Sequence, residues 1–266
     1  MRGGTQAHLL EASDGAFYIV KFSNNLQHRR VLINELLAAE ILKHLRITSP
    51  EYRIIYVSSE FLAQNTEICI QMRKGRREVA PGWHFASRHP GDPGTLATYD
   101  FVPDALLKQV VNLEQFKAIL VFDRWVSNSD CRQAIFFRTR LRDNFAVPHV
   151  SSRKLGYVVS MIDNGLVFDG PGWNLRQSAI TGLYPRPLVY ESVDSIGAFD
   201  PWMTRVLNFP DDVLTKALRI IPPDWLAGDA RELDRLLEAL LRRQSRIVDL
   251  MQDCRSACAS LFPNWN

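Results

Sequence analysis

The order in which strand and helix patterns follow one another constrains this 266-residue chain more than any other feature. Runs of β-branched and aromatic residues bounded by turn residues predict strands over 3–10, 16–22, 52–58 and 67–72. Apolar residues at three- and four-residue spacing predict helices over 31–45, within 105–126 and over 229–254. Two short apolar strands, at 134–137 and 155–162, lie between the later helical segments. A strand-rich part with one helix therefore precedes a mainly helical part that holds a short β-hairpin.

A change of composition near residue 73 predicts where these two parts meet. The charge run RKGRR (73–77) is followed by a segment rich in Pro and Gly, 81–94, which reads as a long loop. A loop of this length between ordered elements is usually functional or a linker. We therefore expect an N-terminal lobe over 1–80 and a C-terminal lobe over 81–266.

Composition excludes several classes of protein. Hydrophobic residues make up 46% and charged residues 23%, as in an ordinary globular protein. No run approaches the roughly 20 apolar residues of a membrane span, and the first residues lack the apolar core of a signal peptide. The four cysteines form no C-x-x-C pair, so we expect reduced thiols and a cytoplasmic protein. A net charge of +3 is too small to demand nucleic acid as a partner.

Three features of the N-terminal part are candidates for a binding site. Gly3, Gly4 and Thr5 form a small turn whose backbone N–H groups can approach phosphate oxygens, although a Gly-Gly pair also fits an ordinary turn. Lys21 stands inside an apolar strand, where it either turns to solvent or holds nucleotide phosphates. Glu35 lies near the edge of the apolar face of the next helix. It can pair with Lys21 or remain a solvated carboxylate.

Two acids flank the predicted hairpin. Asp130 stands just before one short strand, and Asp163 stands just after the other. If the strands pair, both acids reach the same end of the hairpin. Phosphoryl transfer needs such a pair, because one carboxylate orients the attacking hydroxyl while another ligates magnesium. The run Asp163-Asn164-Gly165 also fits a plain tight turn, so it is the two acids together that indicate phosphoryl transfer.

These pieces, taken in order, resemble the HipA-like kinases, a family in the superfamily of protein and phosphatidylinositol kinases. The matching stretches are GGTQAHL (3–9), YIVKF (18–22), Asn34-Glu35, WHFAS (83–87), FDRW (122–125) with Asn128 and Asp130, and IDNG (162–165). The resemblance runs nearly end to end. It implies an α+β, bilobal protein-kinase-like fold, with a β-rich N-terminal lobe containing one helix and a mostly helical C-terminal lobe. It also implies ATP and Mg²⁺ as cofactors.

The resemblance assigns a role to each candidate. Lys21 matches the phosphate-binding lysine and Glu35 its partner, while Asp130 matches the catalytic aspartate and Asp163 the metal-binding one. Gly3, Gly4 and Thr5 would sit in the phosphate loop.

One position departs from the family pattern. The family usually has Asn five residues after the catalytic Asp, as a second metal ligand, and here that residue is Ile135. Gln133 is the nearest amide, and a shortened loop would let it bind the metal. Asp123, seven residues before Asp130, is interpreted as a structural acid paired with Arg124 or Arg132.

The function expected from the resemblance is an ATP-dependent phosphotransferase, a Ser/Thr protein kinase or a relative acting on lipid. The alternative is a pseudokinase that binds nucleotide or a partner without transferring phosphate, which the Ile135 departure favours. A third interpretation is a nucleic-acid binder that uses the arginines of 73–77 and 138–142. The small net charge argues against it, because a charge run is usually a solvated face.

Overall fold

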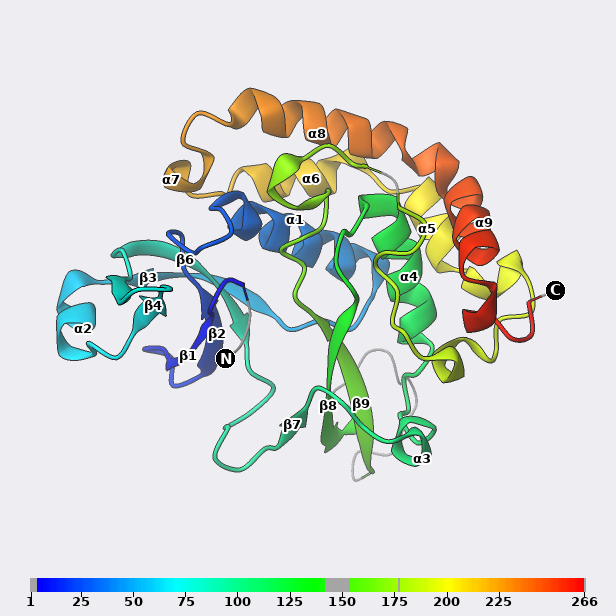
Figure 1. Cartoon of the computed structure of the whole chain (residues 1–266), viewed down its shortest axis with the longest axis horizontal. Helices are drawn as coiled ribbons and strands as arrows, with labels where there is room; N and C mark the ends of the chain where they lie inside the picture. Colours follow the sequence, from blue (N-terminus) through cyan, green and yellow to red (C-terminus); the bar gives the residue numbers. More distant parts are fainter. Residues whose placement is uncertain (1–3, 142–153, 177, 266) are drawn as a thin grey trace.

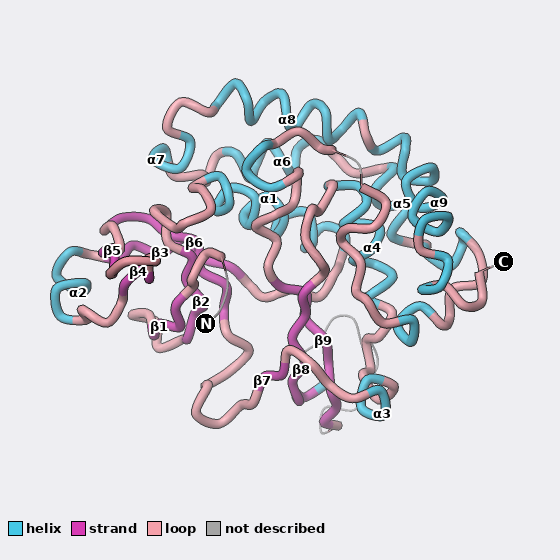
Figure 2. The backbone as a smooth tube through the Cα atoms, in the orientation of Figure 1, coloured by secondary structure: helices cyan, strands magenta, loops and turns pink. Residues whose placement is uncertain are grey.

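The computed structural model describes residues 4–141, 154–176 and 178–265, which form mixed α/β structure with small antiparallel sheets (Figures 1 and 2). The N-terminal sheet has the order β1-β2-β6-β3. Its strands are β1 (His8–Glu11), β2 (Phe17–Lys21), β6 (Gly82–Arg88) and β3 (Tyr52–Val57). The strands expected over 16–22 and 52–58 are confirmed, and the one expected over 3–10 begins at His8.

The two faces of this sheet contact different layers. Tyr18 and Val20 of β2 point to a small apolar cluster under α2 (Ser59–Gln64), β4 (Cys69–Gln71) and β5 (Arg76–Glu78). Because side chains alternate along a strand, Ile19 and Lys21 point to the opposite face. Phe85 of β6 belongs to the main core, which also contains the helix α1 (Arg30–Leu45), expected over 31–45. Lys21 therefore faces the α1 side of the sheet rather than its outer side.

The segment 81–94, expected to be a loop, contains β6 instead. This strand pairs with β2 on one side and β3 on the other, so it is central in the sheet. His84, Phe85 and Ala86 are all buried because both faces of the sheet are covered. A strand buried on both faces lacks the alternating pattern that identifies a strand from sequence. The expected division at residue 80 would separate β6 from the sheet it completes.

The remaining helices build the larger part of the molecule around α4 (Gln115–Val126), which is almost entirely buried (Figure 1). The other helices are α3 (Asp104–Leu107), α5 (Trp202–Leu207), α6 (Asp211–Leu218), α7 (Pro223–Leu226), α8 (Ala230–Arg242) and α9 (Ile247–Ala257). None of the helices within the described ranges is long and apolar enough to span a membrane.

The prediction of a single long helix over 229–254 is wrong in one respect. The helix is interrupted by a 3₁₀ turn, Gln244–Arg246, between α8 and α9. The buried residues Leu240 and Ile247 are seven apart, so the apolar period continues unbroken across the interruption. The Arg243 guanidinium at this bend donates to the backbone carbonyls of Arg124 and Trp125, a contact that no local pattern could indicate.

The predicted hairpin is confirmed. A second antiparallel sheet has the order β7-β8-β9, with β7 (Thr98–Tyr99), β8 (Gln133–Arg140) and β9 (Leu155–Ile162). The register pairs Gln133 with Ile162 and Ile135 with Ser160. Most of the connection between β8 and β9 lies outside the described residues. This register brings the segments before β8 and after β9 to the same end of the hairpin, nearest α1.

Candidate nucleotide and phosphotransfer site

The centre of the candidate site is a buried lysine between two carboxylates. Lys21 Nζ forms an ion pair with Glu35 Oε1 and another with Asp163 Oδ1, at 2.7 Å. The three residues come from β2, α1 and the turn after β9, so segments far apart in the sequence meet here. The Lys21 and Glu35 side chains are only 9% and 3% exposed. The expectation that Lys21 pairs with Glu35 is confirmed.

The charges at this centre shift one another's pKa values. Burial alone would lower the pKa of Lys21, but Glu35 and Asp163 outweigh it and hold that pKa well above its ordinary value. Burial raises the pKa of Glu35, against the opposing influence of the Lys21 ammonium. Burial would also raise the pKa of Asp163, yet Lys21, Arg132 and the Gly165 N–H together outweigh it, and the pKa lies below its ordinary value. Lys21 is therefore held as a cation, and Asp163 as a carboxylate.

The turn after β9 packs directly against α1. The Asn164 N–H donates to Glu35 Oε1 at 3.0 Å. A Cβ on Gly165 would lie 2.5 Å from Cγ1 of Val31, so only glycine allows this close approach. Asp163 itself has φ of +58°, in the left-handed region. The Asp-Asn-Gly run leads from β9 into a turn in which the Val167 N–H donates to the Asn164 carbonyl at 3.2 Å, and it brings Asp163 to Lys21.

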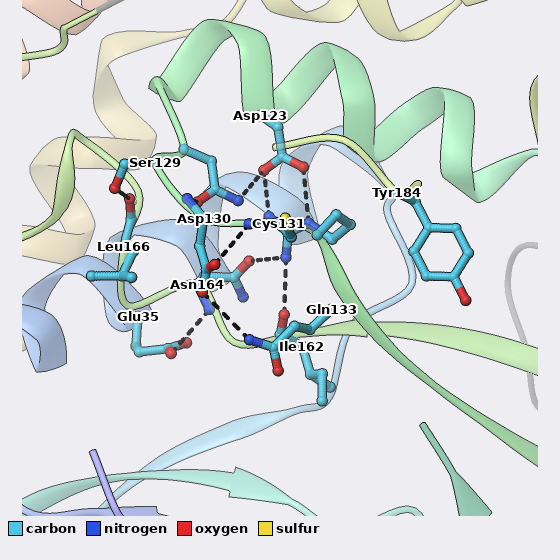
Figure 3. A network of polar contacts seen from close by, with 12 residues as sticks. Glu35, Asp123, Ser129, Asp130, Cys131, Gln133, Ile162, Asn164, Leu166 and Tyr184 are labelled. Carbon is cyan, nitrogen blue, oxygen red and sulfur yellow. Dashed lines mark hydrogen bonds and ion pairs between the residues drawn. The ribbon is translucent and has the colours of Figure 1, made fainter. Parts of the chain in front are cut away.

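Asp130 lies at the same end of the hairpin (Figure 3). Its Oδ1 accepts a hydrogen bond from the Cys131 N–H at 2.8 Å, and its own N–H donates to Asn128 Oδ1 at 3.1 Å. Gln133 Nε2 lies 3.5 Å from Asp130 Oδ2. Asp130 is half-buried and Gln133 exposed, so both side chains are accessible from the site. The turn 128–130 fixes the aspartate through backbone bonds and leaves its Oδ2 reachable.

A second buried ion pair lies behind Asp130. Arg132 donates through Nε to Asp123 Oδ2 at 2.8 Å and through Nη2 to Asp123 Oδ1, and neither side chain is exposed. Arg132 Nη1 donates to the Ile162 carbonyl and to Asn164 Oδ1, both at 2.9 Å. The interpretation of Asp123 as a structural acid is confirmed with Arg132 as its partner. Arg124 instead donates to the Ser178 carbonyl.

Sequence reasoning missed the contacts of Arg132 with Ile162 and Asn164, and the role of Asn34. Asn34 is buried on α1, where its Nδ2 donates to the carbonyls of Gly165, Val167 and Gly170 at 2.8–3.2 Å. Its Oδ1 accepts from Trp173 Nε1 at 2.7 Å. Asn34 thereby ties the helix that carries Glu35 to the segment that follows Asp163. The only local signal for it was an amide on an otherwise apolar helix face.

A cleft of about 990 Å³ lies between the N-terminal sheet and the β8–β9 hairpin, and Lys21, Glu35 and Asp163 are not among the residues that line it. Its walls come from the β1–β2 turn, the loop before β3, the end of β6 with the residues after it, and one face of β8 and β9. That face presents Ile135, Phe137 and Thr139 of β8 and Ser160 of β9. Ile135, which replaces the expected amide, therefore lines the cleft. Two strands that line the cleft, β2 and β9, also carry the ion-paired centre, because Lys21 is the last residue of β2 and Asp163 follows β9.

The N-terminal turn is described only from Gly4 onward, so Gly3 lies outside the described residues. Gly4 is exposed and Thr5 buried. The next residue, Gln6, exchanges two hydrogen bonds with the backbone of Gln71 in β4, at 2.7 and 2.9 Å. The turn is thus attached to the β4–β5 hairpin. A role of Gly3, Gly4 and Thr5 in phosphate binding stays a prediction.

The donors at this site suit a magnesium ion that arrives with phosphates. Among the described residues, no group of three or more His, Cys, Asp or Glu forms a cage that could hold a metal. Magnesium bound with nucleotide typically uses one or two carboxylates, with water and phosphate oxygens completing its octahedron. Asp163 supplies one carboxylate, and the side-chain oxygens of Gln133 and Asp130 lie at the same end of the hairpin. The residues present therefore fit a metal shared with a nucleotide.

Comparison with known proteins identifies one family. The model of the HipA-like kinase family matches residues 1–139, which include β1 to β7, α1 and nearly all of β8. The matched region contains Lys21, Glu35, Asp130 and Gln133, whereas Asp163 lies beyond it. No curated protein matches the chain.

Proposed function

Because the chain belongs to the HipA-like kinase family, we propose that it is an ATP-dependent phosphotransferase whose acceptor is a Ser or Thr hydroxyl. The observation that carries the proposal is the Lys21 ammonium held between Glu35 and Asp163, at the ends of the strands β2 and β9, other residues of which line the cleft. A buried lysine that only stabilised the fold would need one acid. A second, partly accessible carboxylate gives the lysine a place at which phosphate oxygens can compete for it.

In this proposal each residue has a separate task. Lys21 binds phosphate oxygens. Glu35 keeps the Lys21 ammonium oriented when the Asp163 carboxylate binds a metal instead of Lys21. Asp130 Oδ2 accepts the hydrogen bond of the attacking hydroxyl and then its proton. Asp163, with the Gln133 amide, would hold Mg²⁺, which neutralises charge on the phosphate oxygens. Positioning and charge neutralisation carry most of such a reaction, so rigid placement of these groups matters more than their intrinsic reactivity.

We propose that the nucleotide base occupies the cleft, against the apolar face presented by Ile135 and Phe137. Ligand sites combine apolar walls with polar groups. Here Thr139 and Ser160 lie beside the apolar pair, and the opposite wall adds charged groups, Glu11, Asp14, Glu51, Arg88 and Asp92. The cleft lies where the N-terminal sheet meets the β8–β9 hairpin. We therefore also propose two lobes, and place their boundary after Arg88 rather than after residue 80, so that β6 stays with its sheet.

The assignment is tested by replacing Asp130 with Asn. We expect Asp130→Asn to lower kcat by about 10²-fold or more, because general base catalysis typically contributes 10²–10⁴-fold. Affinity for an ATP analogue should stay near that of the wild type, since Asp130 is assigned to the acceptor hydroxyl. Phosphotransfer is measured by ³²P incorporation into casein, phosphatidylinositol and the protein itself. Asp224→Asn, an exposed acid in the first turn of α7, is the matched control.

The second candidate is a pseudokinase, and a specific observation favours it. Ile135 stands at the position of the expected amide ligand, and its aliphatic side chain lines the cleft. Binding of ATP without transfer to any acceptor would establish this alternative. Restoring an amide by Ile135→Asn should then create or raise transfer. The acceptor class, protein or lipid, and the cytoplasmic location stay predictions.

A further inference from the structure

Arg132 occupies an unusual position relative to the proposed metal-binding acid. Its Nη1 bonds to the residues on either side of Asp163, the carbonyl of Ile162 and the side chain of Asn164. Its other nitrogens are held by Asp123, which lies on the buried helix α4. The guanidinium therefore connects the buried helix α4, through Asp123, to Ile162 and Asn164 on either side of Asp163 (Figure 3 labels these three partners).

The backbone of Asp163 needs such support. A non-glycine residue with φ of +58° is uncommon, and such conformations persist when the surrounding structure over-determines them. Three hydrogen bonds bracket Asp163, two from Arg132 and one from the Asn164 N–H to Glu35. Without Arg132, the segment would keep its contacts with Lys21, Glu35 and Asn34 and the pairing of β9, but it would lose its connection to α4. Asp163 would then sample orientations directed away from the nucleotide.

The departure at Ile135 makes this orientation more important. With no amide at that position, Asp163 is the carboxylate that the proposed metal site depends on most. Outer partners that orient a metal ligand typically affect metal affinity by 10- to 100-fold when they are removed. The Asp123–Arg132 pair has the geometry of such a partner, because it fixes the ligand's backbone without occupying the ligand position.

We infer that Arg132 is a positioning residue, which, anchored by Asp123, holds the Asp163 turn in the orientation that binds a divalent metal with nucleotide. This inference rests on the proposed function. The Asp123–Arg132 ion pair, which is fully buried and does not line the cleft, then controls the metal affinity of the site.

The experiment measures Mn²⁺ binding directly, by electron paramagnetic resonance, in the presence of a non-hydrolysable ATP analogue. Arg132→Met and Asn164→Ala should each weaken Mn²⁺ binding by about 10- to 100-fold. Asn164→Ala keeps the backbone N–H that bonds to Glu35 and removes only the side-chain acceptor of Arg132. Binding of the analogue without metal should change little, because Lys21 remains in place.

The matched control is Arg243→Met. Arg243 is also a partly buried arginine that donates to the end of α4, through the carbonyls of Trp125 and Arg124. It makes no contact with the Asp163 turn. This variant should lose stability yet keep wild-type Mn²⁺ affinity, which separates positioning from general destabilisation.

Removing Arg132 alone leaves Asp123 as an unpaired buried carboxylate, which can prevent folding. The double variant Asp123→Leu/Arg132→Met removes both charges and replaces them with apolar groups, a change that buried ion pairs often tolerate. It should fold and still show the loss of Mn²⁺ affinity. Asn164→Ala, which leaves the ion pair intact, provides a second route to the same result.

Two results would overturn the inference. Wild-type Mn²⁺ affinity in the folded double variant and in Asn164→Ala would show that the pair serves the fold alone, while the proposed function would stand. Absence of metal–nucleotide binding in the wild type would overturn the proposed function and this inference together. A selective loss of Mn²⁺ affinity in the double variant and Asn164→Ala, with Arg243→Met unaffected, supports it.

Discussion

At the scale of single residues, Lys21 is buried, so the stability of the folded chain depends on its two ion-pair partners. Lys21→Met leaves Glu35 as an unpaired, buried carboxylate, and breaking such a pair costs about 3–5 kcal/mol. We expect a loss of stability of that order in urea denaturation, together with loss of nucleotide binding. The double variant Lys21→Met/Glu35→Gln should recover most of the stability, because the one carboxylate left without Lys21 is Asp163, which is 35% exposed and can be solvated, but it should not recover nucleotide binding.

The exposed pair Lys216–Asp212 on α6 serves as a control for this prediction. Lys216→Met should leave stability and nucleotide binding unchanged, since exposed ion pairs contribute little. If Lys21→Met proved as mild as Lys216→Met, the buried character of the Lys21 centre would be refuted.

His84 gives the protein a pH-dependent stability of predictable sign. The Ser23 N–H donates to His84 Nδ1, so the ring is neutral and its Nε2–H donates to the Ala80 carbonyl. Burial lowers the pKa of His84 to about 4. Between the unfolded-state pKa of roughly 6.5 and pH 4, the unfolded chain binds a proton that the folded chain does not. Stability should therefore be complete above pH 6.5 and fall by up to about 1.4 kcal/mol per pH unit below it.

Urea denaturation at several pH values checks this expectation. The variant His84→Gln should flatten the dependence over the range from pH 6.5 to 4. His44→Gln, at an exposed position on α1, should not. An unchanged slope in His84→Gln would mean that another group titrates.

The residues of the candidate site differ in how far sequence could reveal them. Lys21, Glu35, Asp130 and Asp163 could be proposed as candidates because each stands at a fixed place relative to a strand or helix, and these places occur in one order. The Asp123–Arg132 pair was one of two that the sequence allowed. The contact of Arg132 with Asn164 could not be predicted, because Asn164 lies 32 residues further on and only folding brings it near.

At the scale of elements, patterns with a clear period were predicted well and buried strands were not. The helix α1 and the β8–β9 hairpin could be placed within a few residues, since periodicity and turn residues mark them. The strand β6 was taken for a loop because flanking Pro and Gly residues dominate its sequence and its centre is buried on both faces. The 3₁₀ break between α8 and α9 leaves the apolar period intact, so it carries no local signal.

A proline substitution tests whether β6 is a central strand. Ser87 pairs with Ile19 on one side and Tyr52 on the other. Ser87→Pro removes a ladder hydrogen bond from a central strand and should cost about 3 kcal/mol or more, or prevent folding. Ala97→Pro, in the connection before β7, is the control and should be tolerated. Hydrogen exchange should also protect the Phe85 and Ala86 amides, and fast exchange there would contradict the strand.

At the scale of the whole molecule, α1 joins the N-terminal sheet to the helices. Arg30 near its start forms a bidentate ion pair with Asp229, at 2.6 and 2.7 Å, and lies over the Trp173 ring. At the end of α1, the Leu45 carbonyl accepts a hydrogen bond from Arg205 of α5 at 2.7 Å. On the sheet side, Phe85 of β6 belongs to the same core as α1, and Lys21 of β2 pairs with Glu35 between these two ends. This coupling implies that the chain unfolds as one cooperative unit.

The last prediction follows from that coupling. Thermal unfolding monitored by far-UV circular dichroism and by tryptophan fluorescence should give coincident transitions, because Trp83 in the sheet and the tryptophans of the helices unfold together. An ATP analogue with Mg²⁺ at 100 times its Kd should stabilise the folded chain by about 2.7 kcal/mol and move both transitions equally.

Arg30→Met removes charged hydrogen bonds worth about 2 kcal/mol and should separate the two transitions or lower both. Arg242→Met, which removes an exposed pair on α8, should do neither. If the wild-type transitions were already separate, or the nucleotide moved only one of them, α1 would not couple the two parts.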